Sequence, residues 1–242
     1  MFKSQVYISK GSAPWYNTDY WPDKDKVISI DESIPGQATV TCKDVTDMGS
    51  MFYDCNKLTL LDLSSFDTSN VTSMWGMFYG CYRLTALDLS NFDTSNVKNM
   101  NYMFSDCNSL TTLDLSNFNT SNVTDMSFMF RNCSSLTTLD LSNFDTSKVF
   151  SSDMDYMFSN CSSLISLDLS SFDTSEITNM MNMFDSCFNL TTIKGIIDMK
   201  SCEWCSNMFT NCHKLKDVKI KNPPSGFNVL SGLSKSQYTI VS

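Results

Sequence analysis

Residues 71–96 read VTSMWGMFYGCYRLTALDLSNFDTSN, and close variants of this stretch recur along most of the chain. The repeat is easiest to follow in its cysteine, which returns at separations of 26, 26, 26, 28, 26 and 25 residues. The equivalent cysteines are Cys55, Cys81, Cys107, Cys133, Cys161, Cys187 and Cys212. A fixed period of this length predicts a solenoid, in which each unit buries its apolar face only against its neighbours.

One unit carries two different periodicities. Val71, Met74, Phe78 and Cys81 fall at helical spacing, so they predict one apolar stripe of a short helix. The Leu-Asp-Leu stretch at 87–89 alternates with a period of two, which predicts a short strand with its leucines pointing inward. Because such strands recur once per unit, the sequence predicts a single parallel sheet with the short helices on the opposite side.

Several positions are apolar in nearly every unit and predict columns of core side chains, in which methionine fills the irregular gaps between helix and sheet. The repeated cysteines belong to these columns. Equivalent residues of neighbouring units lie about 4.8 Å apart, whereas the Cβ atoms of a disulfide lie about 3.8 Å apart. We therefore expect a ladder of buried, reduced thiols.

The composition changes at both ends of the repeats. Residues 1–42 contain strand-like runs such as 27–30 and 38–42, and they predict an N-terminal β-rich cap. Residues 43–221 predict a solenoid of about seven coils, and residues 222–242 predict a C-terminal cap with a closing strand at 237–241. The expected fold is thus an α/β repeat solenoid, capped at both ends.

Composition limits the function classes. The 242 residues carry a formal net charge of -9 without a basic run, which argues against nucleic acid and anionic membrane surfaces as partners. No apolar run approaches the roughly 20 residues that a membrane-spanning helix needs, so membrane insertion is not expected. The first residues lack the apolar stretch of a secretory signal, so either such a signal was removed or the protein is not exported by that route.

The most prominent candidate ligand-binding residues are aspartates between the two strand leucines of each unit. They are Asp62, Asp88, Asp114, Asp140 and Asp168. Each must point out of the sheet because its neighbours point in. One interpretation is that hydroxyl groups of the flanking serine and threonine side chains donate to these carboxylates and offset their mutual repulsion. The other is an acidic strip for a basic partner or a hard cation such as calcium.

Two further features remain open. Trp15 and Trp21 lie in an aromatic cluster that either anchors a ligand or forms the core of the N-terminal cap. A second aspartate column, Asp67, Asp93, Asp145 and Asp173, has Asn119 at its third place, which favours a turn bond over a metal role.

The sequence gives little support for a catalytic site or a metal site. His213 is the only histidine, and it has no paired nucleophile or acid in the repeat pattern. Cys202 and Cys205, with Cys212 and His213, have a superficial zinc spacing, but alignment of the repeats places these three cysteines at core positions. We expect no enzymatic activity, no cofactor and no metal.

The joined motifs LxxLDLSxFDTSN and VTxMxxMFxxC resemble the BspA-like leucine-rich repeats of bacterial surface proteins, from about Cys42 to about Lys221. The resemblance implies a right-handed leucine-rich-repeat coil, usually displayed on or secreted from the cell. It also implies adhesion, including binding of host matrix proteins, and offers no catalytic residues.

Two functions follow as hypotheses. The first is a non-enzymatic adhesion module that recognises protein or glycan ligands through its extended sheet face and loops. The alternative is a structural or decoration subunit of a larger assembly, such as a virion or a surface layer, which the missing export signal favours.

Overall fold

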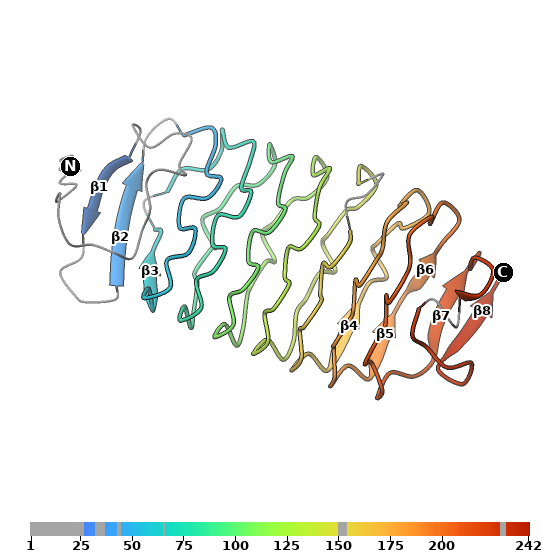
Figure 1. Ribbon diagram of the computed structural model, residues 1–242. Helices are drawn as coiled ribbons and strands as arrows, with labels where there is room; N and C mark the ends of the chain where they lie inside the picture. The colour runs from blue at the N-terminus through green and yellow to red at the C-terminus, as the bar shows by residue number, and fades with distance from the viewer. Residues whose placement is uncertain (1–26, 32–36, 43–44, 65, 150–153, 228–230) are drawn as a thin grey trace.

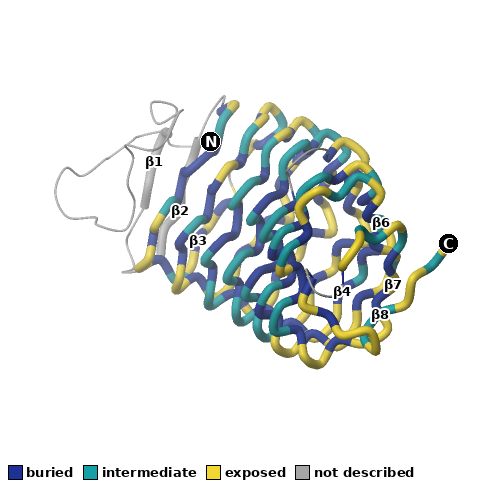
Figure 2. Tube along the Cα trace, turned by 45° about the vertical axis from the view of Figure 1, so that its right-hand side comes forward, coloured by how far each residue is buried: buried dark blue, intermediate teal, exposed yellow. Residues whose placement is uncertain are grey.

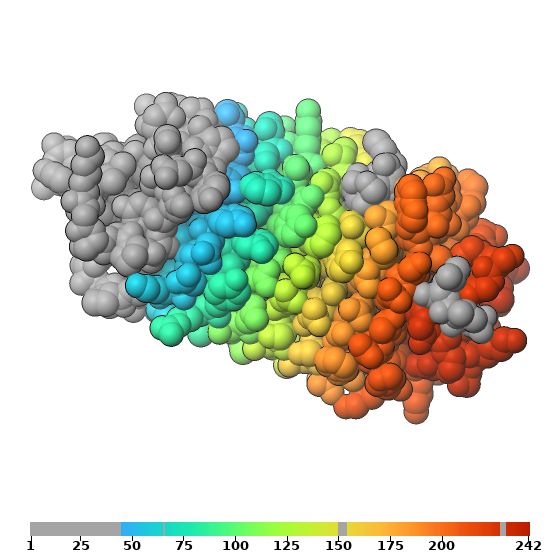
Figure 3. All heavy atoms as spheres, in the orientation of Figure 1, coloured from blue at the N-terminus to red at the C-terminus, as the bar shows by residue number. Residues whose placement is uncertain are grey.

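A computed structural model describes residues 27–31, 37–42, 45–64, 66–149, 154–227 and 231–242. Successive units lie side by side, so the molecule is elongated and its chain runs from one end to the other (Figure 1). In the space-filling view the described units form bands in chain order across the long axis (Figure 3). Each band contacts the bands that precede and follow it, as the fixed period of the sequence predicts.

The described residues contain eight short strands in three small sheets (Figure 1). In the first sheet, β1 (Val27–Asp31) is antiparallel to β2 (Gln37–Cys42), which is parallel to β3 (Leu60–Asp62). In the second, β4 (Ser166–Asp168) is parallel to β5 (Thr192–Lys194). In the third, β6 (Ile196–Asp198), β7 (Val218–Lys221) and β8 (Tyr238–Val241) are all parallel. The strands expected at 27–30, 38–42 and 237–241 are therefore present.

The prediction of one continuous parallel sheet is wrong, because the Leu-Asp-Leu stretches of the middle units are not strands. The backbone amides that would extend the ladder are used locally. In one middle unit the Ser90 amide donates to the Asp88 carboxylate at 3.0 Å, and the Phe92 amide donates to the Leu89 carbonyl at 2.9 Å. The chain turns directly after the leucine, so too few amides reach the neighbouring unit to form a ladder.

The predicted helices are also replaced by turns. We call the eight residues from the first methionine to the repeated cysteine of a unit, 100–107 in the middle of the chain, the turn segment. Its amides alternate between two kinds of partner. The amides of Met103, Ser105 and Cys107 donate to carbonyls three residues earlier, whereas the amides between them donate to the next unit. The distances to the next unit are 3.1 Å for Tyr102 to Ser127, 3.0 Å for Phe104 to Met129 and 2.8 Å for Asp106 to Arg131.

The backbone conformation explains why this segment is not helical. Tyr102 and Asp106 have φ of 59° and 64°, in the left-handed region, and equivalent residues of the other units do likewise. A left-handed residue at every fourth position interrupts the helical bonds from each amide to the carbonyl four residues earlier. The apolar residues still face inward, so a chain of turns satisfies the same apolar spacing that predicted a helix.

The predicted core columns are confirmed, and buried residues return at the same place in successive units (Figure 2). The phenylalanines of the turn segments form a continuous stack with centroid distances of 5.2–5.8 Å and interplanar angles of 4–8°. The stack consists of Phe52, Phe78, Phe104, Phe130, Phe158, Phe184 and Phe209. Methionine, leucine and valine columns surround it, and together they form one apolar core along the molecule.

The repeated cysteines are free and buried, as the sequence predicts. They are not merely apolar fillers, because each thiol from Cys81 onward donates to a phenylalanine carbonyl of the preceding unit. The sulfur–oxygen distance is 3.2 Å from Cys107 to Phe78 and 3.1 Å from Cys133 to Phe104. Burial raises the pKa of the Cys133 thiol well above its usual range, so the thiol stays protonated at neutral pH.

This burial predicts the chemical reactivity of the thiols. Under native conditions Cys81, Cys107 and Cys133 should resist alkylation by iodoacetamide, because they are fully buried and the reagent has no access. Half-buried Cys202 should react before them. All should react once guanidinium unfolds the chain. Peptide mass spectrometry of labelled protein measures the order, and rapid native labelling of Cys107 would contradict the structure.

Buried polar side chains also join the units. In the repeated Asp-Thr-Ser motif, which reads Asn-Thr-Ser at 119–121, the threonine hydroxyl is buried and bonds to the backbone of the next unit. Thr120, for example, bonds to both the carbonyl and the amide of Asp145 at 2.9 and 2.7 Å. The amide group of Asn117 donates to the carbonyls of Leu89 and Phe92 in the preceding unit. Each unit thus satisfies polar backbone groups of its neighbours.

Candidate functional site

The five predicted aspartates lie on the surface in successive units, where the alternating leucines point inward. Asp62, Asp88, Asp114 and Asp140 are exposed, and Asp168 is half-buried. Each carboxylate accepts a hydrogen bond from the backbone amide of the serine two residues later, at 2.9–3.0 Å. The donors in these bonds are backbone amides rather than the serine and threonine hydroxyls that the first interpretation names.

The hydrogen bonds also stabilise the charged form of the carboxylates in this column. The backbone amide and the side chain of Ser116 lower the pKa of Asp114 below its usual value, while repulsion from Asp88 acts in the opposite direction and is weaker. The pKa values of Asp88 and Asp140 are lowered in the same way by Ser90 and Ser142. These carboxylates are therefore ionised at neutral pH although they are neighbours.

Three of the five aspartates border an open hollow of about 540 Å³. Leu87 and Leu113, from the Leu-Asp-Leu stretches of two middle units, line this hollow together with Asp88, Asp114 and Asp140. We call the five aspartates together with this hollow the acidic surface. It combines a narrow apolar floor with a row of fixed negative charges.

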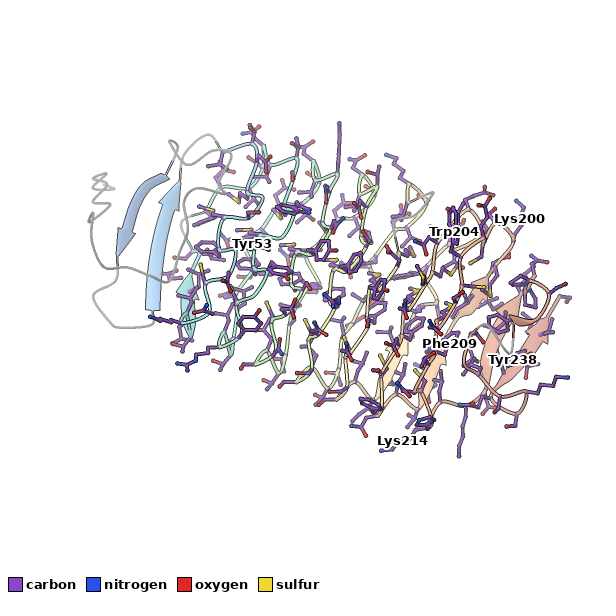
Figure 4. The ribbon with its side chains drawn as sticks, viewed as in Figure 1. Tyr53, Lys200, Trp204, Phe209, Lys214 and Tyr238 are labelled. Carbon is purple, nitrogen blue, oxygen red and sulfur yellow. The ribbon has the colours of Figure 1, made fainter. Side chains whose placement is uncertain are left out.

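The charge changes sign toward the C-terminal end of the same side. Lys194 takes the place of the aspartate in β5, and its ammonium lies 3.5 Å from the Asp168 carboxylate. A second open hollow, of about 560 Å³, follows and is lined by His213, Lys214 and Lys216, among others. Lys214 lies at the lower edge of the molecule in Figure 4. The acidic surface is thus bounded by basic side chains at one end.

The remaining sequence candidates fall in different places. Trp15 and Trp21 lie outside the described residues. The second aspartate column makes turn bonds as predicted, for example from the Ser95 amide to Asp93 at 2.9 Å, and Asn119 accepts the same bond from Ser121 at 3.0 Å.

The cysteine cluster near the C-terminus shows no metal geometry. Cys205 and Cys212 are buried, His213 is exposed, and the Cys212 thiol donates to the Phe184 carbonyl at 3.0 Å. Hydrogen bonding from Cys202 lowers the pKa of Cys205 to about 7. Within the described ranges, no three His, Cys, Asp or Glu side chains gather as a metal site would require.

One exposed feature was missed by the sequence reasoning. Aromatic side chains of five successive turn segments contact one another in a row on the surface, and we call this set the aromatic row. It comprises Tyr53, Trp75, Tyr79, Tyr102, Phe128 and Tyr156. The residues that line the hollow beside the aromatic row are all different from those that line the hollow of the acidic surface. The signal was an aromatic residue at one of the variable positions in each of these five segments.

Comparisons with known proteins address the family rather than the site. A search of curated proteins gave no match to the chain. In the part of the chain that the structure describes, no helix has the length and apolar character needed to cross a membrane. A family model matches twice, over residues 36–138 and 111–222, and the overlap of the two matches reflects the internal repetition. The two matches together cover most of the chain, which therefore belongs to the repeat family described as "Mycoplasma protein of unknown function, DUF285".

Proposed function

We propose that this protein is a non-enzymatic binding module whose acidic surface recognises a protein ligand with a basic surface. The observation that carries the proposal is the row of ionised carboxylates along an open apolar floor. Local hydrogen bonds hold each carboxylate in place, so no conformational change is needed before binding. Opposite charges across an interface increase the rate of association and exclude partners of like charge.

The proposal also covers the architecture of the protein and its location in or outside the cell. Side-by-side units with hydrogen bonds between neighbours support a leucine-rich-repeat solenoid of the BspA-like kind, although turns replace the helices. The resemblance to surface adhesins supports display on the cell surface or secretion, with host matrix proteins as ligands. A long surface built from small units suits extended ligands of this class.

Charge-neutralising variants of the acidic surface test the proposal. In the test variant, Asp88→Asn, Asp114→Asn and Asp140→Asn remove three charges but keep an oxygen to accept each serine amide, as Asn119 already does in the second column. In the matched control, Asp67→Asn, Asp93→Asn and Asp145→Asn remove three charges from turns outside the acidic surface. Both variants therefore have the same net charge.

Binding is measured by biolayer interferometry against a panel of purified extracellular-matrix proteins and a poly-lysine peptide. We expect the unmodified chain to bind at least one matrix protein in a salt-dependent manner. The test variant should lose this binding and the control should keep it. The proposal fails if the chain binds none of the probes, or if both variants bind as well as the unmodified chain.

The alternative, a structural or decoration subunit, is favoured by one observation at the C-terminal end. Strand β8 pairs only with β7 among the described strands, and Ile240 of β8 is 61% exposed. An exposed strand edge with an apolar side chain is a template for pairing with another chain. Recovery of the protein in stoichiometric amounts with virions or surface-layer particles would support this alternative over the binding module.

A further inference from the structure

The unit that contains Cys212 carries a pair of cysteines at the start of its turn segment. In the six preceding units a valine or isoleucine and a methionine enter the core here, and each of them is at most 3% exposed. The two columns are Val45, Val71, Val97, Val123, Val149 and Ile177, and Met48, Met74, Met100, Met126, Met154 and Met180. Alignment of the repeats puts Cys202 in the first column and Cys205 in the second. This unit therefore has two thiols where the others have apolar side chains.

A bend in the chain brings the two thiols together. The amides of Glu203 and Trp204, between the cysteines, both donate to the Thr178 carbonyl of the preceding unit, at 2.8 and 3.0 Å. The chain bends at Glu203, and the side chains of Cys202 and Cys205 are hydrogen-bonded to each other. Trp204 marks the place in Figure 4, toward the C-terminal end of the molecule. The two thiols thus lie close enough to react with each other.

The pair differs from the ladder of repeated cysteines in access and in bonding. Cys202 is half-buried, so the pair can be reached from the surface, whereas the repeated cysteines are at most 3% exposed. Neighbouring thiols of the ladder also interact, as those of Cys187 and Cys212 do, but the Cys212 thiol donates to the Phe184 carbonyl at 3.0 Å. Access from solvent and a partner thiol therefore coincide at Cys202 and not in the ladder.

The hydrogen bond between the two thiols also makes one of them reactive. It lowers the pKa of Cys205 to about 7, against the opposing effect of burial, and it raises the pKa of Cys202. At neutral pH Cys205 is therefore a thiolate in a large fraction of molecules, while Cys202 holds its proton. The thiolate is the nucleophilic form of cysteine, and a thiol beside it can resolve the oxidised product.

We propose that Cys202 and Cys205 form a redox site at which hydrogen peroxide oxidises the two thiols to a disulfide. In the first step the Cys205 sulfur attacks one peroxide oxygen, the O–O bond breaks, and the departing hydroxide takes a proton to become water. Cys205 is then a sulfenic acid. In the second step the Cys202 sulfur attacks the Cys205 sulfur, the S–O bond breaks, and the departing hydroxide leaves as water with the Cys202 proton. One peroxide and two thiols thus give one disulfide and two waters.

The disulfide would close around a junction between two units. The segment between the cysteines bonds to the preceding unit in both directions, because the Trp204 carbonyl also accepts a hydrogen bond from the Met180 amide at 2.8 Å. Oxidation would therefore cross-link the bend that holds this junction. The site shares no residue with the acidic surface, so the inference goes beyond the function proposed above and does not depend on it.

The experiment uses the full chain, reduced and then freed of reductant. The chain is treated with micromolar hydrogen peroxide for increasing times, catalase removes the peroxide, and free thiols are alkylated by iodoacetamide in guanidinium. The tryptic peptide 201–214 contains Cys202, Cys205 and Cys212. We expect this peptide to lose two hydrogen atoms and to be alkylated at Cys212 alone, and dithiothreitol should reverse the change. Because an ordinary thiol is only a few per cent thiolate at pH 7, the pair should react about tenfold faster than any repeated cysteine.

Three results would overturn the proposal. The first is that peroxide leaves all cysteines of the peptide free. The second is that Cys202 or Cys205 is oxidised without a bond between them. The third is that Cys187 and Cys212 become linked as fast as the proposed pair does.

The variant Cys202→Ser tests the role of each sulfur. Serine keeps a hydrogen-bond donor beside Cys205 but cannot form a disulfide, so peroxide should leave a sulfenic acid on Cys205 that dimedone traps. Absence of the dimedone adduct from Cys205 would contradict its role as the attacking sulfur.

The matched control is the double variant Cys202→Val with Cys205→Met. It restores the residue types that the preceding units hold at these two places, so it should fold like the unmodified chain, as circular dichroism would verify. Peptide 201–214 of this variant should keep Cys212 free under the same peroxide treatment. Oxidation of Cys212 in this variant at the rate seen for the pair in the unmodified chain would show that the reactivity does not belong to the pair.

Discussion

The variant Phe104→Ala is expected to lower the free energy of unfolding by about 3–5 kcal/mol, the usual cost of removing a buried phenylalanine. Phe104 is 0% exposed and stacks between Phe78 and Phe130 at centroid distances of 5.7 and 5.8 Å. The substitution leaves a cavity and breaks the stack in the middle of the molecule. Because the adjacent units hold the backbone in place, the neighbours cannot collapse fully into the gap.

Guanidinium denaturation followed by circular dichroism measures the change in the unfolding midpoint. The control is Thr112→Ala, an exposed substitution on the same unit, which should change stability by less than about 0.5 kcal/mol. If Phe104→Ala costs no more than this control, the ring does not occupy the core as described.

The second large effect is expected for Thr120→Val, which replaces a hydroxyl by a methyl group of nearly the same shape. Thr120 is 1% exposed, and its hydroxyl bonds to both the carbonyl and the amide of Asp145. Valine would leave both backbone groups without this partner, at a cost of about 2–4 kcal/mol for the two together. The loss falls on the contact between two units rather than on either unit alone.

The matched control is Thr120→Ser, which keeps the hydroxyl and removes only a buried methyl group. It should cost about 1 kcal/mol. Thermal unfolding of the three proteins, monitored by circular dichroism, gives the comparison. Serine and valine variants of equal stability would mean that the hydroxyl does not connect the units.

The sequence was sufficient to predict the repeat, its core columns and the buried thiols, because side chains at a fixed period must meet their equivalents in neighbouring units. It failed on the helices. Met100, Met103, Phe104 and Cys107 fit one face of a helix, yet a chain of turns points the same residues inward. The distinguishing signal was the residue before each cysteine, which is often Gly, Asn or Asp and holds a positive φ.

For a similar reason, the sequence predicted the alignment of the aspartates but missed the aromatic row. The aspartates occupy one fixed place in five successive units, so their alignment on the surface follows directly from the period. The rings of the aromatic row come from three different places in the turn segment, as Trp75, Tyr79 and Tyr102 illustrate, and only the folded turn segments bring them together. A pattern that repeats in space without repeating in sequence cannot be found from spacing alone.

The alternation of backbone amides in the turn segments has a consequence for how such a protein changes in evolution. Every second amide donates to the next unit, and the buried surface on each side of a unit is nearly the same as that on its neighbour. A gene duplication or deletion of one whole unit would therefore restore the same contacts at the new junction. Recombination between repeats is expected to lengthen or shorten the exposed surfaces without redesign of the interior.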